Sequence, residues 1–337
     1  MVLSSRSIAA CIVAFVFIIA AAFASGWLVK GYVSPASSLS HALRLGGYQF
    51  VDPLLVCNFS NPPLSQQDNT LDNAIKSVID AHTKAGDINK ASVYFSDFTT
   101  GRWADVYPDG KYYPSSLGKI PIMMAYYQLA ESSPGELARR IMYPTGGADL
   151  NQMQDITPAQ AIVPGNSYTV EQLIEYMIKY SDNNATQLLY TNSNQELLNS
   201  VYADLNIPVD EDPNLLNLDF ITPHQISTLF RVLYNATYLS RDDSEQALKL
   251  MSMSSFTQGI VAGVASSTVV SHKLGLVGIA PNNVLTEHEL HDCGIVYGKD
   301  PYLLCVMTRG SGSLSTLERI IAEISAIAYK SVGSAAQ

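Results

Sequence analysis

The longest apolar run of the chain lies near its N-terminus, where residues 7–29 include no charged side chain. This stretch is long enough to cross a bilayer, and it lacks the polar stripe that a soluble helix shows. Arg6 precedes it, which favours an inside N-terminus and an exported remainder. We therefore expect residues 1–30 to be an uncleaved membrane anchor, with a signal peptide cleaved near residues 22–24 as the alternative.

Polar residues and prolines dominate the following segment, residues 31–69, which predicts a stalk or linker. One apolar interruption, GGYQFVDPLLVCNF at residues 46–59, is expected to pack on the domain that follows. Regular patterning begins near Leu71, so we place a folded domain at residues 70–333.

The folded part opens with apolar residues at helical spacing over 71–86, and residues 90–108 then alternate like a hairpin. Helical segments follow for well over a hundred residues. Three strand-like runs and a helix then close the domain, at residues 267–278, 291–298, 301–310 and 314–332.

Strands at both ends of the domain, with helices between them, predict an α+β fold with one antiparallel sheet formed from both ends. An all-helical lobe, approximately residues 116–245, would then be inserted into an α/β lobe made of residues 70–115 and 246–333. The cleft between two such lobes is the natural place for a site.

Composition and charge narrow the possible partners. Hydrophobic residues make up 47% of the chain, which permits a substantial core. The formal net charge of −10 argues against a nucleic-acid partner, because no basic patch would release counterions from phosphate. Cys293 and Cys305 lie on successive predicted strands, and a hairpin would set them opposite each other. A disulfide and two buried free thiols are both open interpretations.

The stretch YYPSSLGKIPIMMAYY, residues 112–127, places two serines and a lysine at the start of an apolar helix. Pro121 is tolerated only in the first turn, so Ser116 lies near the helix N-terminus. Lys119 is three residues further on and shares its face. Partial burial would lower the pKa of Lys119, and a neutral lysine can take the serine proton. The alternative is that Ser115 or Ser116 merely caps the helix.

A second polar stretch follows a predicted helix that starts with a Thr169–Gln172 capping box and ends at Tyr180. Ser181 and Asn183 would face the cleft while Asp182 braces the turn. An ordinary helix–helix turn is the alternative, since Ser, Asp and Asn are common there.

A third stretch, VVSHKLGLVG, places Lys273 within a strand, two residues before Gly275. Glycine in a strand often marks the close approach of another backbone or of a ligand. Lys273 would be a cation for a substrate carboxylate, or else an edge-strand lysine that opposes aggregation.

Ser-x-x-Lys, Ser-Asp-Asn and Lys-x-Gly follow one another in the order typical of penicillin-recognising serine enzymes. From about Leu71 to Val332 the chain resembles class A β-lactamases and their relatives. The resemblance implies that Ser116 attacks a β-lactam carbonyl to form an acyl-enzyme, with Lys119 as its proton acceptor. Ser181 would pass a proton to the leaving nitrogen.

The same resemblance implies the substrate contacts. Asn183 would hold the side-chain amide of the substrate, and Lys273 would attract its carboxylate. The backbone N–H groups of Ser116 and Leu276 would form the oxyanion hole, with Leu276 following Gly275 on the strand.

Two departures from the family pattern qualify this expectation. The third motif reads Lys-Leu-Gly where the family usually has Lys-Thr-Gly, which predicts weaker substrate binding. The family's Glu-x-x-Leu-Asn motif, whose glutamate activates the deacylating water, is missing. Glu211 lies in the matching place and is the candidate for this base. The alternative is that Glu211 belongs to a solvated acidic turn. Without that base the acyl-enzyme would persist, as in penicillin-binding proteins.

We therefore expect a serine β-lactamase-type hydrolase. A D-Ala-D-Ala peptidase acting on peptidoglycan stem peptides is the first alternative, and a non-catalytic wall-binding domain is the second. No cofactor or metal is expected, because His288 and His291 are three residues apart and lack the zinc-protease spacing. We expect residues 287–291 to form a solvated turn between two strands instead. The protein is expected to be a monomer that is extracytoplasmic and membrane-anchored.

Overall fold

The computed structural model describes residues 43–56, 66–209, 219–280 and 284–334. The predicted membrane segment and Glu211 therefore lie outside the described residues. Within the described residues, none of the helices combines the length and the apolar character that a membrane span needs.

A six-stranded sheet forms the centre of the domain, in the order β3-β5-β4-β10-β9-β8. The strands are β3 (Gln66–Gln67), β4 (Lys90–Asp97), β5 (Arg102–Val106), β8 (Val269–Ile279), β9 (Glu287–Tyr297) and β10 (Tyr302–Gly310). Strand β4 pairs antiparallel with β10, so the two ends of the domain meet in the middle of the sheet. The short strand β3 alone pairs parallel, with β5. The predicted α+β fold with a sheet from both ends is confirmed.

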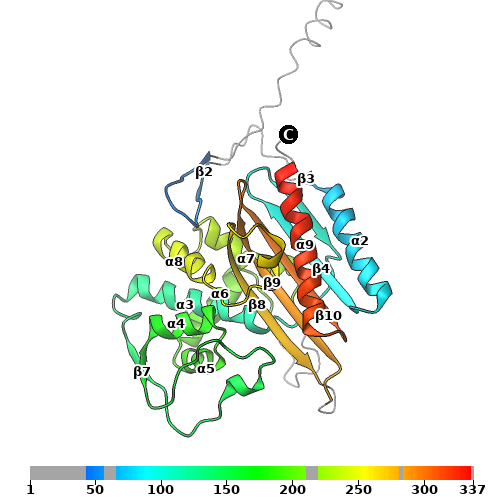
Figure 1. Cartoon of the computed structure of the whole chain (residues 1–337). Coiled ribbons are helices and arrows are strands. Elements are labelled where there is room, and N and C mark those ends of the chain that lie inside the picture. Colours follow the sequence, from blue (N-terminus) through cyan, green and yellow to red (C-terminus); the bar gives the residue numbers. More distant parts are fainter. Residues whose placement is uncertain (1–42, 57–65, 210–218, 281–283, 335–337) are drawn as a thin grey trace, which may run out of the picture. The chain divides into compact units, whose positions relative to one another are not determined.

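Two helices cover one face of this sheet, α2 (Asn69–Ala85) and α9 (Leu314–Ser334), which lie side by side in Figure 1. Their apolar residues, such as Ile75 and Ile320, are fully buried in a cluster with Val93 and Val306 from the strands. The side chain of Asp68 caps the first turn of α2. The termini of the domain thus pack together on one side of the sheet.

The opposite face carries the helical lobe. Its helices are α3 (Lys119–Ser132), α4 (Val170–Lys179), α5 (Asn183–Thr191), α6 (Gln195–Asp204), α7 (Pro223–Tyr234) and α8 (Arg241–Met251). Residues 119–127 of α3 are all buried, as expected for a helix that is apolar on every side. The lobe is not entirely helical, because β6 (Arg140–Met142) and β7 (Ser167–Thr169) pair antiparallel, and β7 leads directly into α4.

The apolar interruption of the predicted stalk packs on the domain. Phe50 and Val51 are buried, and the ring of Phe50 meets that of Tyr297 edge-on. The carboxylate of Glu245 accepts hydrogen bonds from three successive backbone N–H groups, those of residues 49–51. These contacts lie between β1 (Leu43–Arg44) and β2 (Leu54–Val56), which pair as a small antiparallel sheet.

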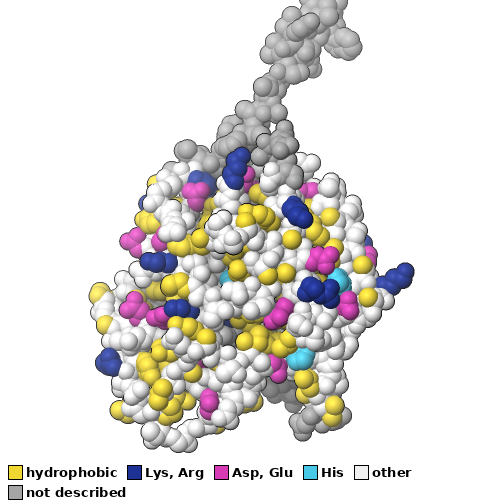
Figure 2. Space-filling view, in the orientation of Figure 1, with side chains coloured by type: hydrophobic (Ala, Val, Ile, Leu, Met, Phe, Trp, Pro, Cys, Tyr) yellow, Lys and Arg dark blue, Asp and Glu magenta, His cyan; other side chains and the backbone are white. Residues whose placement is uncertain are grey.

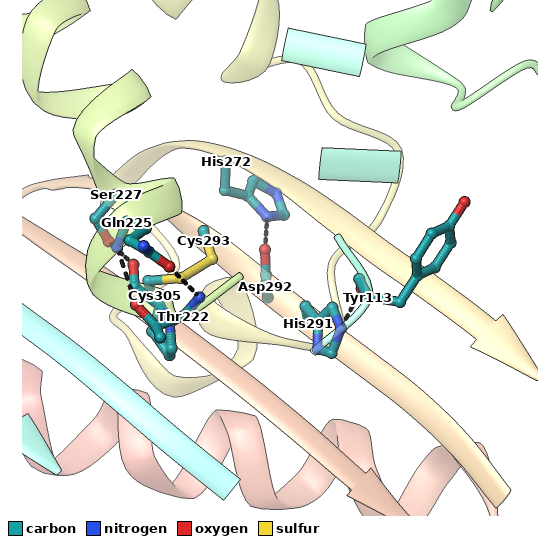
Figure 3. Close-up of a disulfide and its surroundings, with 10 residues drawn as sticks. Tyr113, Thr222, Gln225, Ser227, His272, His291, Asp292, Cys293 and Cys305 are labelled. Atoms are coloured by element: carbon teal, nitrogen blue, oxygen red, sulfur yellow. Dashed lines mark hydrogen bonds and ion pairs between the residues drawn. A yellow bond between two sulfur atoms is a disulfide. The ribbon is translucent and has the colours of Figure 1, made fainter. Parts of the chain in front are cut away.

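Cys293 and Cys305 form a disulfide between directly opposed positions of β9 and β10. Both residues are fully buried under helix α7, whose Thr222–Gln225 capping box lies close by in Figure 3. Of the two interpretations open from the sequence, the structure has the disulfide. It ties the two strands that follow β8 in the chain.

Candidate active site

A cleft of about 1130 Å³ lies where the helical lobe meets β8. Hydrophobic side chains gather in this region of the surface in Figure 2. The cleft is lined by polar residues from two separate segments, namely Ser115, Ser116, Lys119, Ser181 and Asn183. Its apolar lining includes Met153, Ile156, Leu276, Val277 and Leu285.

Ser116 lies in a short 3-10 helix, η1 (Ser115–Gly118), that leads directly into α3. Pro121 is the third residue of α3, so the helix begins where the proline predicted. Pro114 and Gly118 occupy the two capping positions, and neither cap involves a side-chain hydrogen bond. The interpretation of Ser115 or Ser116 as a simple N-cap is therefore wrong.

Gly275 lets β8 lie against the turn that carries Ser116. A Cβ atom at this position would come within 2.9 Å of the Pro114 carbonyl oxygen and 3.3 Å of the Leu117 side chain. A side chain here would therefore push the nucleophile turn away from the sheet. The sequence predicted that another backbone or a ligand approaches Gly275 closely, and in the structure it is the backbone of Pro114.

The hydroxyl of Ser181 is the meeting point of the three predicted motifs. Its Oγ is hydrogen-bonded to Ser116 Oγ at 3.1 Å. Lys119 Nζ lies 3.2 Å from the same oxygen and Lys273 Nζ lies 3.0 Å from it. Ser181 itself adopts a positive φ of 60°, which aims the side chain at the cleft from the turn between α4 and α5.

Lys119 contacts Ser181 rather than Ser116. Its Nζ lies 2.7 Å from the Ser181 carbonyl oxygen and 2.8 Å from Asn183 Oδ1. Burial holds the pKa of Lys119 well below its usual value, and the nearby charge of Lys273 lowers it further. A neutral amine has two protons for these two acceptors and keeps a lone pair for the Ser181 hydroxyl.

Lys273 is fully buried on the other side of Ser181 and also donates to the Leu274 carbonyl oxygen at 3.2 Å. Burial lowers the pKa of Lys273 to about 7, although the charge of Asp292 opposes this shift. Its Nζ is therefore not exposed in the cleft, and the Ser181 hydroxyl lies between this nitrogen and the cleft.

Asp182 braces the turn as expected, and it does so from a fully buried position. Its Oδ1 accepts hydrogen bonds from the backbone N–H groups of Asn184 and Ala185, and its Oδ2 from that of Ile162. Asn151 donates to Asp182 and accepts from the Asn183 N–H. No pattern in the sequence pointed to Asn151, because its contacts join segments about thirty residues apart.

The backbone of Tyr113, just before the nucleophile turn, is also held by side chains that sequence reasoning missed. Glu289 Oε2 accepts from the Tyr113 N–H at 2.9 Å. His291 Nε2 lies 3.0 Å from the Tyr113 carbonyl oxygen, a contact drawn in Figure 3. Both residues are fully buried on β9. The expectation of a solvated turn at residues 287–291 is wrong, because these residues begin strand β9 and the side chains of Glu289 and His291 bond to the Tyr113 backbone.

Leu276 follows Gly275 on β8, and its backbone faces the nucleophile turn. The Leu276 N–H donates to Ser115 Oγ at 3.1 Å, and the Leu276 carbonyl oxygen accepts from the same hydroxyl at 2.5 Å. All the predicted site residues except Glu211 are thus gathered around η1 and residues 273–276 of β8.

No curated protein matches this sequence. Among solved structures, PBP-A is 19% identical with a TM-score of 0.65, covering 80% of this chain and 98% of that chain. A class A β-lactamase from Mycobacterium abscessus is 22% identical with a TM-score of 0.63, covering 78% and 99%. These two likenesses establish the fold. The profile of the Beta-lactamase enzyme family matches residues 70–332. The chain belongs to the Beta-lactamase enzyme family.

Proposed function

We propose that this protein is a serine hydrolase of class A β-lactamase type, which opens β-lactam rings through an acyl-enzyme on Ser116. The observation that carries the proposal is the convergence on Ser181. One hydroxyl lies within 3.2 Å of the nucleophile and of two lysine nitrogens with lowered pKa values. A purely structural turn needs neither of the two buried lysines.

Acylation then proceeds through Ser181. As Ser116 Oγ bonds to the lactam carbonyl carbon, its proton moves to Ser181 Oγ while the Ser181 proton moves to neutral Lys119. The ring C–N bond breaks, and the proton returns from Lys119 through Ser181 to the leaving nitrogen. The backbone N–H groups of Ser116 and Leu276 stabilise the oxyanion that forms between these two steps.

The substrate contacts extend this proposal. Asn183 holds the side-chain amide of the substrate, and its Oδ1 also orients Lys119. Lys273 attracts the substrate carboxylate through its positive charge, which lies behind the Ser181 hydroxyl that lines the cleft. Leu274, where the family usually has threonine, supplies no hydroxyl of its own, so binding is expected to be weak.

Binding of a carboxylate-bearing β-lactam should weaken as the pH rises through about 7, the pKa of Lys273. The lysine is charged below that value and neutral above it, so the attraction is lost on the alkaline side. We expect the affinity to fall by up to about tenfold per pH unit there. The measurement is the saturation constant for acylation against pH. The methyl ester of the same lactam is the matched control, and an equal fall for the ester would contradict this role.

A penicillin-binding-protein-like peptidase acting on D-Ala-D-Ala ends is the second candidate. It draws on the likeness to PBP-A, a mutant of which was solved as an acyl-enzyme complex with penicillin-G. The missing Glu-x-x-Leu-Asn motif favours it as well, since acyl-enzyme hydrolysis would then lack its usual base.

The test is intact-mass spectrometry of the full-length chain after mixing with benzylpenicillin, followed over time. An adduct that forms and then disappears supports the β-lactamase. An adduct that persists, together with cleavage of a D-Ala-D-Ala peptide, supports the peptidase. The Ser116→Ala variant is the control, and an unmodified wild-type chain that also leaves the benzylpenicillin intact would refute both.

We also propose that the protein works as a membrane-anchored, extracytoplasmic monomer. The uncharged N-terminal segment after Arg6 supports the anchor, with a cleaved signal peptide as the alternative. The Cys293–Cys305 disulfide is in keeping with an exported domain.

A further inference from the structure

The residue just before the nucleophile makes an unusual pair of contacts. Ser115 Oγ accepts a hydrogen bond from the Leu276 N–H and donates one to the Leu276 carbonyl oxygen. Ser115 lines the cleft and is only partly buried. One hydroxyl thus satisfies both backbone groups of Leu276 at the point where the substrate is expected to bind.

These backbone groups are the ones that an incoming substrate needs. Strand β8 is an edge strand of the described sheet and pairs only with β9. Because the N–H and C=O of Leu276 bond to Ser115, they point away from β9 and towards the cleft. An edge strand offers such groups to an extended, amide-bearing ligand. In the free protein, Ser115 takes the ligand's place.

The neighbouring contacts hold Ser115 in this position. Ser115 has a φ of 49°, in the left-handed region that non-glycine residues rarely adopt. Just before it, the Tyr113 backbone is bonded to Glu289 and His291, and the Pro114 carbonyl oxygen lies against Gly275. These contacts fix the turn to the sheet, and they hold the Ser115 hydroxyl against the Leu276 backbone.

We propose that the Ser115 hydroxyl occupies the oxyanion site of the free protein and must be displaced before Ser116 can be acylated. Ser115 is then a specificity-determining residue that slows acylation. It discriminates against ligands that bring only a carbonyl oxygen, because these replace one of its two hydrogen bonds and leave the Leu276 carbonyl unpaired. This inference rests on the proposed function, since it assigns the Leu276 N–H to the oxyanion.

Two variants of the full-length chain test it, Ser115→Ala and Ser115→Gly. Both remove the hydroxyl, and glycine also tolerates the positive φ, so the pair separates loss of the hydroxyl from backbone strain. We expect the rate constant for acylation by benzylpenicillin to rise about tenfold in both, the factor that corresponds to one net hydrogen bond. A Ser116→Ala exchange in each background shows that the adduct is on Ser116.

A second probe keeps the inference separate from the proposed function. A small arylboronic acid forms a tetrahedral adduct on an activated serine, with one oxygen in the oxyanion site. It should bind both variants about tenfold more tightly than the wild type. Equal or weaker boronate binding in the variants, or slower acylation, would overturn the inference. If the Ser115 hydroxyl only stabilised the turn, or if it donated a hydrogen bond to the oxyanion, its removal would weaken boronate binding and slow acylation. If benzylpenicillin fails to acylate the wild type, the proposed function falls while the boronate comparison still decides this point.

Discussion

Replacing Ser181 with alanine is expected to slow the acylation of Ser116 by about 10²–10⁴-fold, the usual contribution of a positioned proton-transfer group. Ser181 Oγ is the one side-chain atom among the described residues that is hydrogen-bonded to Ser116 Oγ. Both lysines reach the nucleophile only through this oxygen. Its loss therefore separates the nucleophile from every group that could take its proton.

The measurement is the second-order rate constant for adduct formation with benzylpenicillin. Ser325→Ala is the matched control, because Ser325 is also buried and its hydroxyl also donates one hydrogen bond, in this case to the Ile260 carbonyl oxygen. Both variants lose one buried hydroxyl, so comparable shifts in the unfolding midpoint are expected. Acylation within tenfold of the wild-type rate in Ser181→Ala would show that another route carries the proton.

Sequence reasoning succeeded where local chemistry decides the structure. Pro121 fixed the start of α3, and the Thr169–Gln172 capping box formed as predicted. Strand alternation also brought Cys293 and Cys305 opposite each other. In each case the deciding contact lies within one element or between adjacent strands, so its residues are neighbours in the sequence pattern.

The pattern failed where contacts join distant segments. Three-residue spacing placed Lys119 and Ser116 on one face and suggested direct proton transfer, but in the structure Lys119 turns to the Ser181 turn. The reason is that acceptors some sixty residues away satisfy the buried amine better than one hydroxyl. The Ser115–Leu276 contact likewise depends on how η1 docks on β8, which no local spacing encodes.

Lys119→Met is expected to slow acylation by about 10³-fold, because it removes the proton acceptor and keeps most of the apolar stem. The variant should also lose a feature of the pH profile. In the wild type, acylation falls as the pH drops through the lowered pKa of Lys119, since the protonated amine has no lone pair. That acid limb is expected to disappear in the variant along with most of the rate.

The control for Lys119→Met is Lys179→Met, at a partly exposed lysine paired with Glu175 outside the cleft. It should leave the rate and the acid limb unchanged. Lys119→Met leaves the Ser181 carbonyl oxygen and Asn183 Oδ1 without this donor, so a lower unfolding midpoint is expected and does not bear on the chemistry. Acylation that survives within tenfold would assign the base to Lys273, the other amine on Ser181, whose pKa of about 7 would then set the acid limb.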